Sequence, residues 1–94
     1  MSNTAAKQTK QDFRNNSGEL NFNIQRHLGV LSTSKSGWTK EVNLVSWNDR
    51  PSKLDIRDWN PEHEKMGKGL TLNGSEVAYL TDILKDFDIA EAGI

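Results

Sequence analysis

The chain has 94 residues and contains no cysteine. Disulfide bonds are therefore excluded, and so is a zinc site built from thiolates. Long hydrophobic runs are also lacking, since no segment approaches the roughly 18 apolar residues that a transmembrane helix requires. No apolar segment follows the first lysines, as a secretory signal would require. The sequence therefore predicts a cytoplasmic protein with no membrane partner.

The segment 1–18 has few large apolar side chains. Apart from Met1, Phe13 is the only one, and most of the others are polar. Such a segment cannot bury enough apolar surface to offset the entropy lost on ordering, so residues 1–18 are predicted to form a disordered tail. A single domain is expected at 19–89, with a frayed end at 90–94. About 70 folded residues without a disulfide are marginal as a monomer, which favours a homodimer.

Charge of one sign does not dominate, because the formal net charge is −1. A near-neutral balance argues against avid nucleic-acid binding. The distribution is uneven, however: residues 35–69 carry seven basic and six acidic side chains, whereas residues 70–94 carry one basic and five acidic. The acidic charge thus gathers at the C-terminal end, and the central segment can still present a local positive surface.

Apolar residues alternate with polar ones along much of the chain. This period of two predicts β-strands at 20–32, with an irregularity near 27–29, and at 38–47, 53–59 and 67–72. Asn73 followed by Glu76 forms a capping-box pattern at the start of a helix that is expected to end near Asp88. The order predicts an α+β fold, in which a four-stranded antiparallel sheet is followed by one C-terminal helix.

The predicted helix carries an apolar stripe that should cover one face of the sheet. Leu54 and Ile56 are expected to meet the helix there, whereas Trp47, Arg57 and Trp59 lie on the opposite face. The stripe is larger than one thin sheet can cover, which again favours association with a second copy. The predicted dimer interface consists of Val77, Leu80, Ile83, Leu84 and Phe87.

Three neighbouring runs, LDIRDW at 54–59, PEHEKM at 61–66 and GKGLTLN at 67–73, resemble the transcriptional positive cofactor four family. Together with the run at 37–48 they look most like its bacterial YdbC-like branch. The resemblance implies a four-stranded antiparallel sheet followed by a helix, paired into a homodimer. It further implies that single-stranded DNA binds across the sheets of the dimer, on basic and aromatic side chains.

Four positions match the family's binding residues. Trp47 stands where the family has an aromatic residue at the end of its second strand, Arg57 matches the Asp-Ile-Arg arginine, Trp59 follows it, and Lys68 precedes the last strand. The turn at 48–52 is poorer in lysine than in eukaryotic members. The N-terminal segment also lacks their serine-rich acidic character, so the eukaryotic coactivator role does not carry over directly.

The residues themselves support the same chemistry. An unpaired strand is bound by flat aromatic surfaces for its bases and by cations for its phosphates, and an amide can donate to and accept from bases. The predicted nucleic-acid-binding residues are Trp38, Lys40, Asn43, Trp47, Lys53, Arg57, Trp59, Lys65 and Lys68.

Each of these residues also has an ordinary structural interpretation. A tryptophan in a small sheet is often part of the core, a lysine can simply be solvated, and Arg57 could pair with Asp55 or Asp58.

The Glu-His-Glu run at 62–64 offers too few ligands for a metal site. Asp55 and Asp58 point to opposite faces of a strand and cannot act as an acid–base pair. No catalytic residue, cofactor, metal or small-molecule substrate is predicted, and the protein is not expected to be an enzyme.

Two functions are consistent with this pattern. The first is a largely sequence-independent single-stranded DNA-binding homodimer, acting in transcription, replication or repair and compatible with association with the nucleoid. RNA is also compatible, since stacking and phosphate contacts serve both nucleic acids. The alternative is a protein-interaction module, a transcription cofactor that docks a partner chain on the same face. The near-neutral charge and the acidic helix favour that alternative.

Overall fold

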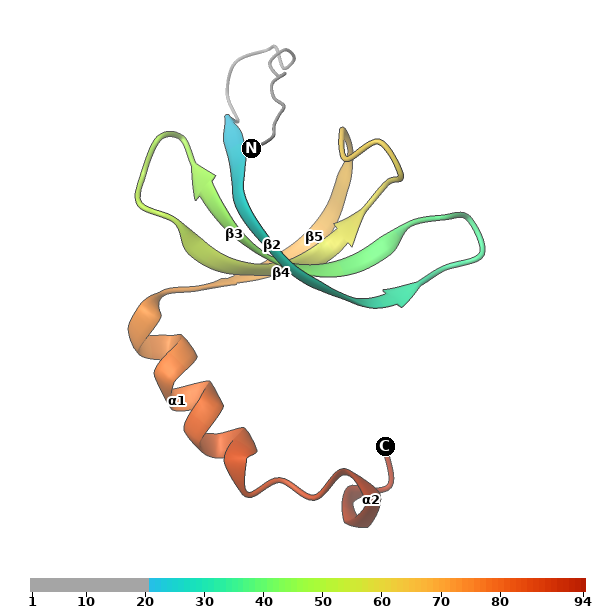
Figure 1. The fold of residues 1–94 in the computed structure, drawn as a ribbon, viewed down its shortest axis with the longest axis vertical. Helices are drawn as coiled ribbons and strands as arrows, with labels where there is room; N and C mark the ends of the chain where they lie inside the picture. The colour runs from blue at the N-terminus through green and yellow to red at the C-terminus, as the bar shows by residue number, and fades with distance from the viewer. Residues whose placement is uncertain (1–20) are drawn as a thin grey trace.

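The computed structural model describes residues 21–94, and the tail predicted at 1–18 lies outside this range. Four strands precede two helices (Figure 1). The elements are β2 (Phe22–Thr33), β3 (Thr39–Trp47), β4 (Lys53–Trp59), β5 (Met66–Leu72), α1 (Gly74–Lys85) and α2 (Ile89–Ala92). The predicted α+β class is confirmed, and the strand predicted at 53–59 agrees with β4 at both ends.

The four strands form one antiparallel sheet in the order β2-β3-β4-β5. Residues paired across neighbouring strands point to the same side of a sheet. Glu41 pairs with Arg57, and Asn43 pairs with Asp55, so these four side chains share one side. The sheet is curved, and the ends of its strands bend away from α1 (Figure 1). We call the inside of this curve, which carries these four side chains, the concave face. The residues that alternate with these four along β3 and β4 point to the other side, the convex face, toward α1.

Strand β2 is irregular along its whole length. Its register with β3 shifts between Ile24 and Arg26, between His27 and Gly29, and between Val30 and Ser32. Each bulge adds a residue on one strand only, which bends the strand and increases its twist. The irregularity predicted near 27–29 is confirmed, and two further bulges accompany it. Together they carry β2 around the edge of the concave face.

The most deeply buried side chains of the described residues lie on or beside the concave face. Val45 and Trp59 have no exposed surface, and Phe22 packs against Trp59 with 5.3 Å between the ring centres. Polar residues are buried among them: Glu41, Asn43, Asp55 and Asn60. The side-chain oxygen of Asn60 accepts hydrogen bonds from two backbone amides at 64 and 65, which closes the loop between β4 and β5. The concave face is therefore a compact layer in which these four buried polar side chains find partners within the chain, whereas the buried indole N–H groups of Trp47 and Trp59 have none among the described residues.

Helix α1 begins with the predicted capping box. Asn73 accepts a hydrogen bond from the backbone N–H of Glu76, and the Glu76 side chain accepts one from the backbone N–H of Asn73, both at 2.9 Å. This satisfies two amide groups that a helix start otherwise leaves without partners. The helix ends at Lys85, three residues before the predicted end. The chain then forms the short helix α2, where the sequence predicted a frayed end.

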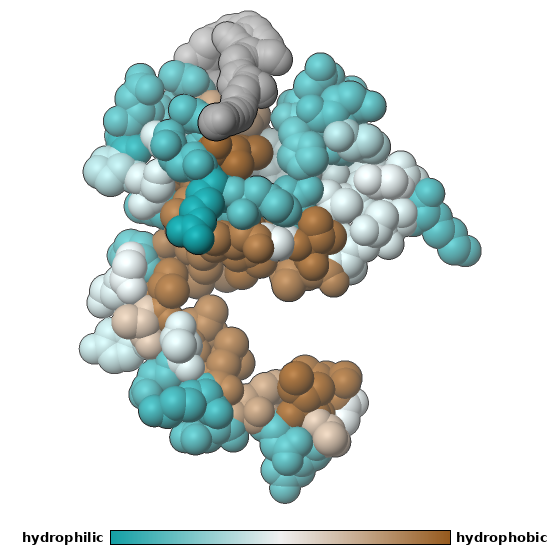
Figure 2. Space-filling view, viewed as in Figure 1, coloured by the Kyte–Doolittle hydropathy of each residue, from teal (hydrophilic) through white to brown (hydrophobic). Residues whose placement is uncertain are grey.

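The expected covering of the sheet by the helix is wrong for the single chain. Only Asn73 separates β5 from α1, and α1 runs away from the sheet rather than back across it (Figure 1). No residue of α1 is buried, and Ile83 is 69% exposed. Figure 2 shows apolar side chains along the convex side of the sheet and along the helices below it. Leu54 and Ile56 are thus not sealed by the helix of their own chain. None of the helices in residues 21–94 is long and apolar enough to cross a membrane.

Candidate nucleic-acid interface

The residues predicted to bind nucleic acid fall on two faces of the sheet. Asn43, Trp47, Lys53, Arg57 and Trp59 occupy the concave face, as their cross-strand pairing shows. In contrast, Lys40 pairs with Asp58 on the convex face. There, Lys40 lines one hollow with Trp38 and another with Lys68. Lys65 lies in the loop before β5. One continuous surface made of all these residues is therefore not present in the chain.

Trp47 and Arg57 form a stacked pair on the concave face. The guanidinium carbon of Arg57 lies 4.7 Å from the centre of the Trp47 ring, within the range of a cation–π contact. Phe22 packs against Trp47 on β2, with 6.0 Å between ring centres. Trp47 is half-buried, so part of its surface remains accessible at the end of β3. This pair brings an aromatic platform and a cationic plane together.

Arg57 is nevertheless committed to Asp55. Its Nε and Nη2 atoms donate to the two carboxylate oxygens of Asp55, each at 2.7 Å, and Nη1 donates to the carbonyl oxygen of Gly67 at 3.4 Å. Asp55 is fully buried, and the Arg57 side chain is only 14% exposed. The ion-pair interpretation of Arg57 is confirmed for Asp55. The expectation that Arg57 is free to contact phosphate is wrong for this chain, because its charge and most of its donors are matched within the chain.

Gly69 makes room for this arrangement. It pairs with Arg57 across β4 and β5. A Cβ atom at position 69 would lie 2.6 Å from the carbonyl oxygen of Ile56 and 2.8 Å from Nε of Arg57, well inside van der Waals contact. The glycine therefore allows the Arg57 side chain to extend flat over β5 toward Gly67.

Trp59 is a core residue, and the expectation that it offers an open stacking surface is wrong. It has no exposed surface. Phe22 packs against it from β2, and the ring of His63 stacks on it at 5.7 Å between centres with 26° between planes. The alternation of β4 does place Trp59 on the same face as Arg57, as predicted. One covering residue comes from β2 and the other from the loop that follows β4, and the pattern of β4 alone reveals neither contact.

Asn43 is also enclosed, so the expected contact between its amide and a base is wrong for this chain. Its side-chain oxygen accepts a hydrogen bond from Nδ1 of His27 at 2.7 Å, and its side-chain nitrogen donates to Oε1 of Glu41 at 3.2 Å. The residue has no exposed surface. Its amide therefore links His27 to Glu41 instead of meeting a ligand.

Glu41 is the centre of a network that the sequence interpretation missed. Its Oε2 atom accepts from Nε2 of His63 at 2.7 Å and from the Thr39 hydroxyl at 2.5 Å, while Oε1 accepts from Asn43. Burial raises the pKa of this carboxyl. The donors from Thr39, Asn43 and His63, together with the charge of His63, outweigh burial, so the pKa lies below its ordinary value of 4.5. Thr39 and Asn43 stand only two residues from Glu41 on the same strand, but the two histidines, His27 and His63, stand 14 and 22 residues away, and no local motif links them to it.

The remaining predicted cations are open to solvent. Lys53 lies on the concave face opposite Val45, and Lys65 lies in the loop of residues 60–65. Within residues 21–94, neither has a carboxylate oxygen within 4.0 Å, since the ion pairs found there involve His27, Arg57, His63 and Lys85. Both lysines are therefore available to a phosphate.

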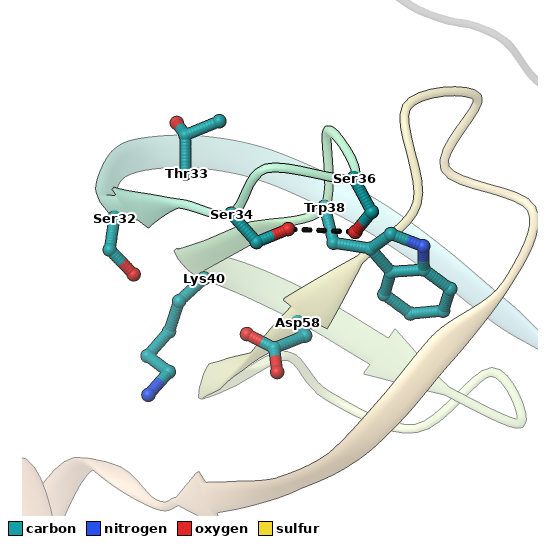
Figure 3. A pocket seen from close by; sticks show the side chains of 7 residues that line it. All are labelled: Ser32, Thr33, Ser34, Ser36, Trp38, Lys40 and Asp58. Carbon is teal, nitrogen blue, oxygen red and sulfur yellow. Dashed lines mark hydrogen bonds between the residues drawn. The ribbon is translucent and has the colours of Figure 1, made fainter.

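A shallow pocket lies at the β2–β3 hairpin, apart from Trp47. Its volume is about 360 Å³, and it is lined by Ser32, Thr33, Ser34, Ser36, Trp38, Lys40 and Asp58. Figure 3 shows Lys40 and Asp58 extending on the same side of the hairpin, with the hydroxyls of Ser34 and Ser36 joined at 2.9 Å. Trp38 is half-buried here. The carboxylate of Asp58 makes this pocket less favourable to phosphate than the open lysines of the other face.

Comparison with known proteins identifies the family. An uncharacterized protein of Treponema pallidum (strain Nichols) is 44% identical over 71 residues, which cover 76% of this chain and 84% of that protein. A family model described as Transcriptional Coactivator p15 (PC4) matches residues 34–83. That match runs from the β2–β3 turn through β3, β4 and β5 into α1, and so includes Trp47, Asp55, Arg57 and Gly69. The chain therefore belongs to the transcriptional coactivator p15 (PC4) family.

Proposed function

We propose that the protein binds single-stranded DNA on its concave face, without sequence preference and without catalysing a reaction. The observation that carries this proposal is the Trp47–Arg57 pair beside Lys53. Stacking of a base on an aromatic side chain contributes about 1–3 kcal/mol, and an exposed lysine neutralises a phosphate. Membership of a family described as a transcriptional coactivator supports a nucleic-acid-binding or coactivator-like role.

In this proposal each of these residues has a separate task. Trp47 offers its accessible surface to a base, and Arg57 packs against the ring while Asp55 fixes the guanidinium in place. Lys53 then supplies the unpaired charge. Every base has a flat face, and a lysine reads only the backbone, so this combination discriminates poorly between sequences. That is the chemistry expected of a protein that covers single strands of any sequence.

We further propose that the protein acts as a homodimer joined through α1 and the convex face. Leu70 on β5 is 54% exposed, and Ile83, Leu84 and Phe87 on α1 are all exposed. Monomeric proteins rarely leave a contiguous apolar surface of this kind in water. A second copy supplies a surface of the same character. In a two-fold arrangement, the helix of each copy can cover the convex face of its partner's sheet.

Tryptophan fluorescence and the anisotropy of a labelled oligonucleotide test the proposal. A mixed-sequence single strand should quench the fluorescence and bind at much lower concentration than the matching duplex, and added salt should weaken the binding. Trp47→Ala should lower the affinity by about 5- to 150-fold, which corresponds to about 1–3 kcal/mol. Trp38→Ala is the matched control on the hairpin pocket and should have the smaller effect.

Two results would contradict the proposal. If Trp38→Ala abolishes binding while Trp47→Ala does not, the concave face is not the binding surface. If neither single strand nor duplex changes the anisotropy at low salt, the protein does not bind DNA, and docking of a partner protein becomes the better account of the concave face.

A further inference from the structure

We propose that His27 and His63 contact the phosphates of the bound strand only when they are protonated, so that binding is coupled to proton uptake. The inference rests on the proposed function and adds two residues and a means of regulation to the same face. Its basis is the hydrogen-bond network around Glu41, which determines what each imidazole can offer to a ligand.

The carboxylate fixes the tautomer of His63. Nε2 of His63 lies 2.7 Å from Oε2 of Glu41, and a carboxylate oxygen only accepts, so Nε2 carries the hydrogen. In the neutral ring the other nitrogen, Nδ1, is then a bare acceptor. Phosphate oxygens are acceptors as well, so the neutral ring of His63 has no hydrogen to give them. Protonation turns Nδ1 into a charged donor.

The same argument applies to His27 through Asn43. The Asn43 side-chain nitrogen donates to Glu41, so the Asn43 oxygen is the atom that faces His27. Nδ1 of His27 therefore carries the hydrogen, and Nε2 is the bare nitrogen of the neutral ring. Within the described residues, no hydrogen-bond partner is found for Nε2 of His27 or for Nδ1 of His63. A phosphate can thus approach either nitrogen once it is protonated.

Both rings are anchored and accessible at the same time. The side chains of His27 and His63 are 52% and 41% exposed, whereas the Glu41 side chain beneath them is 4% exposed. His63 is also held by its stacking on Trp59. The two imidazoles therefore project from a rigid buried layer and need not be ordered when the strand binds, which reduces the entropy cost of contact.

The charge balance of the face makes these two protons significant. Arg57 and Lys53 are offset by Asp55 and Glu41, so with neutral imidazoles these side chains sum to zero. Position 69 on β5 is glycine and position 71 is threonine, so neither adds charge. Arg26 pairs with Leu44 and so points to the convex face, whereas Glu62, Glu64 and Lys65 flank His63 in the loop between β4 and β5. Protonation of both rings therefore adds two positive charges to a face that carries no excess of positive charge, which favours a polyanion.

The test measures the affinity of the full chain for a labelled single strand at pH 8 and pH 6, at several salt concentrations and constant buffer composition. The wild type should bind on the order of tenfold more tightly at pH 6. Its plot of log affinity against log salt should be steeper at pH 6 by about 1.4, or about 0.7 for each phosphate gained. His63→Gln retains a side-chain N–H for Glu41, and the double variant with His27→Gln should show no pH dependence. Lys53→Gln is the matched control, since it should weaken binding by the same factor at both pH values.

NMR titration of the two rings in the wild type gives a second readout that needs no variant. Addition of the oligonucleotide at pH 7 should shift both rings toward their protonated state. Strong binding at both pH values with no change in affinity or slope overturns this inference and leaves the proposed function intact. Retention of the pH dependence by the double histidine variant overturns it in the same way. Absence of binding at either pH refutes the proposed function and this inference together.

Discussion

The two faces of the sheet solve the problem of burial in different ways. On the concave face, polar groups such as Glu41, Asn43 and Asp55 are enclosed, and each finds hydrogen-bond partners within the chain. The convex face has aliphatic side chains that its own helix does not cover. The first face is therefore packed within one chain, although the buried indole N–H groups of Trp47 and Trp59 have no partner among the described residues, whereas the second face leaves apolar surface open. A small sheet can in this way separate the surface that presents a ligand site from the surface that supplies stability.

The largest expected effect comes from placing a charge on the surface that we propose as the dimer interface. Ile83→Asp should convert the dimer to a monomer, because each buried aliphatic side chain contributes about 1.5–3 kcal/mol and a two-fold interface loses it twice. Sedimentation at micromolar concentration measures the change. Ala78→Asp, which lies on the opposite side of α1 by helical periodicity, is the control and should remain dimeric. If the wild-type protein sediments as a monomer, no second copy covers the convex face, and the proposed difference between the two faces is contradicted.

Trp59→Ala tests whether the concave face is packed within the chain. Removal of a fully buried tryptophan should lower the free energy of unfolding by about 3–5 kcal/mol, because the cavity under Phe22 and His63 cannot collapse fully. Urea denaturation followed by circular dichroism measures the loss. Trp38→Ala should cost less, since Trp38 is only half-buried. Equal losses for the two variants would mean that Trp59 is not the centre of the core.

Asp55→Ala tests the ion pair that holds Arg57 on Trp47. The substitution leaves a nearly buried guanidinium without its partner and should destabilise the fold by about 3 kcal/mol. Replacing Arg57 by Met as well should recover part of that loss, because the second change removes the uncompensated charge. Denaturation of both variants checks this. If the loss of stability in the double variant equals the sum of the losses in Asp55→Ala and Arg57→Met, the two side chains are not coupled.

The smallest effect is the acid sensitivity of the Glu41 network. The folded-state pKa of Glu41 lies below its ordinary value of 4.5, so the network stabilises the fold above that value. This contribution is lost as the pH falls through the lowered folded-state pKa. Denaturation between pH 6 and pH 3 should show a steeper loss of stability for the wild type than for Glu41→Gln. Parallel curves for the two proteins would argue that the network contributes nothing to acid stability.

Local patterns predicted much of the fold. The alternation in β4, the capping box of Asn73 with Glu76 and the pairing of Arg57 with Asp55 all depend on residues two or three positions apart. The path of α1 could not be read in this way, because it depends on the single residue that joins the helix to β5. The sequence therefore identified the elements but not which face they leave uncovered.

The candidate site was predicted less completely than the fold. The strand alternation placed Trp47, Arg57 and Trp59 on one face, as found, but the burial of Trp59 results from Phe22 and His63, which come from β2 and from a loop. Grouping Lys40 with Trp47 joined residues whose strand positions differ by an odd number, and such residues point to opposite faces. Contacts between distant segments thus decided which aromatic and basic residues can meet a ligand.

The three bulges of β2 also limit how the protein assembles. A regular edge strand presents an unbroken row of amide and carbonyl groups onto which further chains can add, and this growth leads to fibrils. The register of β2 shifts three times between Ile24 and Ser32, so no long flat row is present on that edge. Growth by strand addition at β2 is therefore opposed. The proposed association through the helices would instead close into a discrete pair, so we expect particles of defined size even where many copies gather on the proposed DNA ligand.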